Sequence, residues 1–77
     1  MKVEVLGTGC AKCHKLEETV RDLVKKNDID AEVVKVEDIK VISGHGVFMT
    51  PALVVDGEVK VAGKLPKESE ILKWLSA

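Results

Sequence analysis

Two cysteines separated by two residues stand near the start of the 77-residue sequence, at Cys10 and Cys13. They follow Gly7-Thr8-Gly9, a flexible turn, and they precede a segment with the apolar spacing of a helix. A thiol at the first turn of a helix is favoured as the thiolate, because free backbone N–H groups and the positive end of the helix dipole lie there. Since the thiolate is the attacking species in thiol–disulfide exchange, the spacing predicts a redox-active pair.

The two cysteines are expected to have different roles. Cys10 falls at or just before the start of the helix and is the better nucleophile, whereas Cys13 lies one turn further in and is the resolving partner. Lys12, His14 and Lys15 add positive charge, and we take Lys12 and His14 as the candidates that lower the thiol pKa. A bridge that closes so short a loop stabilises a fold by only about 2 kcal/mol, which disfavours a purely structural disulfide.

The composition excludes several functional classes. Twelve basic and 13 acidic residues give a formal net charge of -1, which disfavours a nucleic-acid binder. An apolar content of 45% excludes a disordered chain, and no apolar run approaches the roughly 18 to 20 residues of a membrane span. The start of the sequence shows no export leader, so we expect a cytoplasmic protein, in which two cysteines are more often redox-active or metal-binding than structural.

Residues 1–77 are expected to form one α/β domain with the element order β-α-β-α-β-β-α. Strands are predicted over 3–6, 31–36, 52–55 and 58–61, and helices from the cysteines to about Asn27, over 38–43 and from Pro66 onward. The first helix is long enough to connect two parallel strands. Asp56-Gly57 is the strongest hairpin signal in the chain and makes the last two strands antiparallel.

Essentially the whole chain resembles the thioredoxin/glutaredoxin superfamily, and most closely its small redox-active disulfide proteins that begin with Gly-Thr-Gly-Cys-x-x-Cys. The resemblance is carried by the strand–CxxC–helix start, by Met49-Thr50-Pro51 before the apolar strand, by the Asp56-Gly57 hairpin, by Gly63 and by the terminal helix. It implies a thioredoxin-like fold with a four-stranded mixed sheet, in which the strands lie in the order second, first, third, fourth, with helices on both faces. It also implies a cis Thr50–Pro51 bond against the cysteines.

The resemblance implies exchange of a Cys10–Cys13 dithiol or disulfide with protein disulfides, without another cofactor and without a metal site. Met49, Thr50 and Pro51 are expected to bind the substrate, with the Thr50 backbone pairing with an extended partner segment. Met49 is also expected to fill part of the core. A thioredoxin-reductase-like partner would restore the dithiol, and the protein is expected to be a monomer that binds neither nucleic acid nor membrane.

The sequence also departs from the usual patterns of this superfamily. Gly9 stands where thioredoxins usually have Trp, and Ala11-Lys12 replaces both the Gly-Pro of thioredoxins and the Pro-Tyr of glutaredoxins. The segment 62–65 has no acidic residue of the kind with which glutaredoxins grip glutathione. Glutathione is therefore not the expected reductant.

Two other uses of the cysteines stay open at this stage. Soft-metal carriers of ferredoxin-like fold have a similar loop, and two thiolates suit Cu(I) or Zn(II). Those carriers end in a strand, whereas Ile71, Leu72 and Leu75 predict a terminal helix. The motif Cys-x-x-Cys-His also matches the one used for covalent haem attachment, but a four-stranded sheet leaves little room for a haem.

The two histidines have weaker signals. His14, on the first helical turn, could tune Cys10 or ligate a metal, but we expect a solvated helix residue. His45 lies between Gly44 and Gly46, in a loop that the expected fold brings near the cysteines, and we expect a turn residue rather than a proton shuttle or ligand.

The position of Cys10 makes a measurable prediction, namely a thiol pKa below about 8.5. At a pKa of about 7, roughly half of the thiol is ionised at pH 7, against roughly 3% at the unperturbed value. The rate of alkylation of the reduced protein, followed against pH, measures this pKa. A value at or above about 8.5 would contradict activation by the helix start.

Overall fold

A computed structural model describes residues 1–76 of the chain. The elements are β1 (Lys2–Leu6), α1 (Ala11–Lys26), β2 (Glu32–Val36), α2 (Ile39–Gly44), β3 (Ala52–Val55), β4 (Glu58–Ala62) and α3 (Glu68–Leu75). The strands form one sheet in the order β2-β1-β3-β4. Strand β1 runs parallel to β2 and antiparallel to β3, and β3 pairs antiparallel with β4, which confirms the expected mixed sheet.

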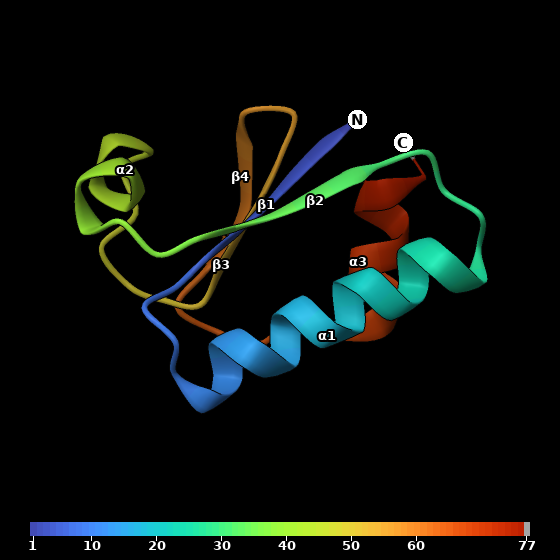
Figure 1. Ribbon diagram of the computed structural model, residues 1–77, viewed down its shortest axis with the longest axis horizontal. Coiled ribbons are helices and arrows are strands. Elements are labelled where there is room, and N and C mark those ends of the chain that lie inside the picture. Colours follow the sequence, from blue (N-terminus) through green and yellow to red (C-terminus); the bar gives the residue numbers. More distant parts are fainter. Residues whose placement is uncertain (77) are drawn as a thin grey trace.

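The three helices divide between the two faces of the sheet. In Figure 1, α1 and α3 lie together on one side of the strands and α2 lies alone on the other. Alternation along β1 explains this division, because Val3 and Val5 face the two larger helices while Leu6 faces α2. The larger core, between the sheet and α1 and α3, consists of Val3, Val5, Leu16, Val20, Leu23, Leu53, Val55, Val61, Ile71 and Leu75.

The smaller core under α2 includes Leu6, Ile42 and Val54, and a polar contact lies on the same side. The carboxylate of Glu4, in the middle of β1, is 3.4 Å from the Nε2 atom of His45, and both side chains are largely buried. His45 is the residue that ends α2. His45 is a turn residue, as its glycine neighbours predict, and its side chain also joins the end of α2 to the centre of the sheet.

Local signals place most element boundaries. Asn27 ends α1, and its side-chain amide donates to the Leu23 carbonyl oxygen at 2.9 Å. The Asp38 carboxylate begins α2 by accepting the Lys40 N–H at 2.9 Å. Asp56 and Gly57 have φ values of 50° and 83°, the left-handed conformations that a two-residue hairpin of this kind requires.

The start of α3 differs from the prediction. Pro66 was expected in the first helical turn, but α3 begins at Glu68, with Lys67 as the residue that precedes it. The Lys67 N–H donates to the Glu70 carboxylate at 3.2 Å, which stabilises a start two residues later. Pro66 is buried ahead of the helix instead.

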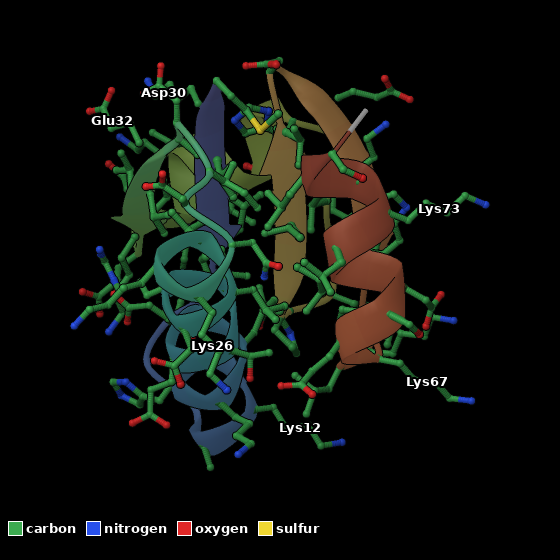
Figure 2. All side chains as sticks on the ribbon, turned by 90° about the vertical axis from the view of Figure 1, so that its right-hand side faces the viewer. Lys12, Lys26, Asp30, Glu32, Lys67 and Lys73 are labelled. Carbon is green, nitrogen blue, oxygen red and sulfur yellow. A yellow bond between two sulfur atoms is a disulfide. The ribbon has the colours of Figure 1, made fainter. Side chains whose placement is uncertain are left out.

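The outer surfaces of α1 and α3 are charged. Figure 2 shows Lys12 and Lys26 on α1, and Lys67 and Lys73 at α3, pointing away from the body of the fold. This is the solvated face of an amphipathic helix, opposite the apolar stripe that faces the core. Within residues 1–76, no helix has both the length and the apolar character that crossing a membrane demands.

Candidate functional site

The two cysteines lie where β1 gives way to α1, and they are joined by a disulfide with their Cα atoms 5.1 Å apart. Cys10 precedes the helix with extended backbone angles (φ −70°, ψ 163°). Its sulfur accepts the Cys13 N–H at 3.2 Å, and its carbonyl oxygen accepts the His14 N–H at 3.0 Å. A backbone N–H aimed at this sulfur would stabilise a thiolate after reduction, because a hydrogen bond to a charged acceptor is stronger than one to a neutral acceptor.

The two cysteines differ in exposure, as the sequence predicts. Cys10 is exposed, whereas Cys13 has only 1% of its surface exposed. Gly7 explains part of this burial, because a Cβ at position 7 would overlap the Cys13 sulfur and lie 2.7 Å from the Cys13 Cβ. The Gly7 N–H also donates to the Val36 carbonyl oxygen at 2.9 Å, which ties this loop to the end of β2. Of the two cysteines, Cys10 is therefore the one at the surface of the fold.

The Thr50–Pro51 bond is cis, as expected, and Pro51 is fully buried. The register between β1 and β3 explains where Pro51 lies. Leu6 pairs with Ala52, so Pro51, which precedes Ala52, lies next to the end of β1. Thr8, two residues before Cys10, and Thr50 line one common pocket. The loop that carries the cysteines and the loop that carries the cis bond are therefore neighbours.

Met49 lies on the surface of this region, with 66% of its area exposed. The expectation that Met49 fills the core is wrong, because the residue belongs to the loop before β3 and packs over Gly63 instead. An ideal Cβ at Gly63 would be only 3.0 Å from the Met49 Cβ, and Gly63 has a φ of 82°. The Gly63 N–H donates to the Pro51 carbonyl oxygen at 2.9 Å, so the end of β4 supports this loop.

The pocket beside the two loops has a volume of about 250 Å³ and is mainly apolar. Its wall includes Phe48, which is 87% exposed, and residues of α2. The complete lining is Thr8, Ile39, Ile42, Ser43, Val47, Phe48 and Thr50. Sequence reasoning named Thr50 but missed Phe48, although a Phe next to Met49-Thr50-Pro51 in a chain with one Phe and one Trp is a usable signal.

The charged groups around the cysteines are only partly those predicted. Lys12 and His14 are both exposed, and Lys12 points outward in Figure 2. The structure adds Glu37, which was not predicted. An ideal Cβ at Gly9 would be 3.7 Å from the Glu37 Oε2 atom and 4.0 Å from the His14 Nε2 atom. Glu37 follows β2, so only the packing of β2 beside β1 brings this carboxylate to the cysteine loop.

Residues 1–76 match the Thioredoxin domain family. The chain belongs to this thioredoxin family. A thioredoxin from Methanothermobacter thermautotrophicus is 43% identical over 76 residues, which cover 99% of each chain. A thioredoxin from Methanocaldococcus jannaschii is 39% identical over 75 residues, which cover 97% of this chain and 86% of the relative.

Family membership and structure together confirm the predicted class. The protein is a thioredoxin-like thiol–disulfide oxidoreductase whose redox-active group is the Cys10–Cys13 disulfide. The ferredoxin-like carrier that stayed open as an alternative has another topology, with a strand at its end, whereas this thioredoxin-like chain places α3 after β4. In the part of the chain from residue 1 to 76, the structure gathers no group of three or more His, Cys, Asp or Glu side chains that could hold a metal ion.

The close contact between Gly7 and Cys13 predicts that alanine destabilises the fold more at position 7 than at position 44. Gly7→Ala should lower the free energy of unfolding by about 1 to 3 kcal/mol, because the added methyl group overlaps the Cys13 side chain. Gly44→Ala is the control, since it ends a helix and has no atom within 4 Å of the new methyl group. Chemical denaturation of the oxidised variants measures both changes. Equal stabilities for the two variants would show that the Cys13 side chain is not confined by Gly7.

Proposed function

We propose that the protein exchanges disulfides with partner proteins through Cys10 as the attacking sulfur and Cys13 as the resolving sulfur. The observation that carries the proposal is the position of Cys10, an exposed residue at the start of α1 whose sulfur accepts the Cys13 N–H. This environment favours an anion at Cys10 more than at Cys13, which is buried. Cys13 is well placed for the second step, because it needs to reach only the neighbouring sulfur.

The exchange proceeds in two balanced steps. The Cys10 thiolate attacks one sulfur of the partner disulfide, the partner S–S bond breaks, and the other partner sulfur leaves as a thiolate that takes up a proton. Cys13 then loses its proton and attacks Cys10 in the mixed disulfide, which releases the second partner thiol. The partner gains two electrons and two protons, and the protein is left with the Cys10–Cys13 disulfide.

The partner segment is proposed to lie across the Thr50–Pro51 edge in extended form, with Met49 and Phe48 as apolar contacts. The loop holding Thr50 neighbours the loop holding Cys10, so a segment paired there would present its disulfide to the exposed sulfur. The adjoining pocket of about 250 Å³ has room for one apolar side chain next to the partner's cysteine.

The remaining features of the proposal concern the cellular setting. A thioredoxin-reductase-like protein is proposed to return two electrons to the Cys10–Cys13 disulfide. We also propose that the protein works as a monomer in the cytoplasm, where reducing conditions keep most thiols free. The near balance of 12 basic and 13 acidic residues supports a protein partner rather than nucleic acid.

The assignment of roles predicts the outcome of trapping. Cys13→Ser should accumulate a mixed disulfide between Cys10 and a partner protein, because the resolving step is lost. For the wild type, the measurement is the release of reduced insulin chains. For the variant, it is the mass of the adduct that forms during incubation with oxidised insulin. Cys10→Ser is the matched control and should form no adduct. An adduct on Cys13 in that control, with none on Cys10 in Cys13→Ser, would reverse the two roles.

Loss of the exposed Phe48 side chain is predicted to weaken the binding of protein partners. Phe48→Ser should raise KM for insulin roughly fivefold with little change in kcat, because it removes apolar contact area without touching the cysteines. Turnover of a small aromatic disulfide that is too short to span the pocket should stay unchanged. Val59→Ser is the control, as Val59 is also exposed but lies on β4. Equal KM values for the two variants with insulin would place docking elsewhere.

A further inference from the structure

A row of alternating charges leads from the side of α1 to the loop that carries Cys10. Arg21 contacts Glu17 at 3.1 Å, and the Lys35 Nζ atom lies 3.9 Å from a carboxylate oxygen of Glu17 and 3.9 Å from one of Glu37. Glu37 is the last member of the row. Its Oε2 atom is the one that lies 3.7 Å from the ideal Cβ position of Gly9.

This placement sets a negative charge close to the nucleophile. Consecutive Cα atoms are about 3.8 Å apart, so the Glu37 oxygen is no more than about 9 Å from the Cα of Cys10. The Cys10 sulfur is about 3 Å from that Cα, so the carboxylate is at most about 12 Å from the sulfur, close to the distance of about 8 to 10 Å over which physiological salt screens charges. Helix α1 has no acidic residue in its first turn, where Lys12 and His14 supply basic groups. The negative charge beside this loop therefore comes from a different element of the fold.

We propose that Glu37 makes the Cys10–Cys13 pair more reducing, by opposing the thiolate that forms on reduction. The disulfide carries no charge, whereas the reduced pair carries a negative charge on Cys10 in the proposed function, on which this inference rests. A carboxylate near that sulfur raises the free energy of the reduced form and leaves the oxidised form almost unchanged. The equilibrium therefore shifts toward the disulfide, so that electrons pass more readily to a partner.

The size of the effect is limited by solvent. The Glu37 side chain is 60% exposed and lies 3.9 Å from the Lys35 ammonium group, and both facts weaken its field. We therefore expect Glu37→Gln to change the equilibrium constant with glutathione about threefold in favour of the dithiol. This change corresponds to a potential about 14 mV less negative, because a tenfold change is 29.6 mV for a two-electron couple.

The test measures the equilibrium constant in glutathione buffers at pH 8.5, where an ordinary thiol is about half ionised. Glu37→Gln removes one negative charge and Glu37→Lys reverses it, so the second variant should change the constant about ninefold in the same direction. Both changes should almost vanish at about 1 M salt, where the screening distance falls to about 3 Å. Glu58→Gln is the matched control, since Glu58 is an exposed carboxylate that also contacts a lysine, at the start of β4 and the other end of the sheet.

The inference is supported if the two substitutions at position 37 scale with charge, disappear with salt and leave the Glu58 control unshifted. It is overturned if Glu37→Gln leaves the constant unchanged at low salt, or if Gln and Lys have equal effects that persist at high salt. Trapping with Cys13→Ser separates this inference from the proposed function. An adduct on Cys10 together with an unshifted constant overturns the role of Glu37 alone. An adduct on Cys13 in the Cys10→Ser control, with none on Cys10 in Cys13→Ser, overturns the assigned attacking sulfur, whereas a shift that follows charge would still support the effect of Glu37 on the pair.

Discussion

The hydrogen bond from the Cys13 N–H to the Cys10 sulfur is the interaction on which the rest of the site depends. It exists because the backbone is extended at Cys10 and becomes helical at Ala11, so that one free N–H group of the first turn of α1, that of Cys13, points toward this sulfur. The same change of conformation turns Cys13 inward, against Gly7. One change of backbone direction thus produces an exposed cysteine whose sulfur accepts a backbone N–H and a buried cysteine next to it.

The sheet supplies what this junction cannot supply by itself. Antiparallel pairing of β1 with β3 brings the residues after Leu6 to the same end of the sheet as the residues before Ala52. The cis Thr50–Pro51 segment therefore lies beside the cysteine loop, although 39 residues of sequence lie between Cys10 and Thr50. Strand β2 pairs in parallel with the edge of β1 that β3 does not occupy. Glu37, which follows β2, therefore reaches the cysteine loop from the side opposite to β3. The cysteine loop thus has the cis Thr50–Pro51 segment on one side and the Glu37 carboxylate on the other.

Met49 and His45 both have contacts that the local sequence does not predict, because their neighbours come from distant parts of the chain. Met49 is apolar and was expected inside, but Gly63, with no side chain, provides a surface on which Met49 rests while staying exposed. His45 is a turn residue, as its two glycine neighbours predict, and Glu4 of the central strand also contacts it. Helix α3 begins at Glu68 and not at Pro66 for a more local reason, because the Glu70 carboxylate accepts the Lys67 N–H.

The sequence by itself determined the order of the elements, the redox pair and the different roles expected of its two sulfurs. These follow from short-range physics, because apolar periodicity, turn residues and the position of a thiol at a helix start all act within about ten residues. Only the tertiary structure decided which groups surround that pair. The pocket wall at Phe48, the exposed position of Met49 and the carboxylate of Glu37 depend on strand order and register. Strand order and register arise from packing both faces of one sheet, and no local pattern in the chain records that packing.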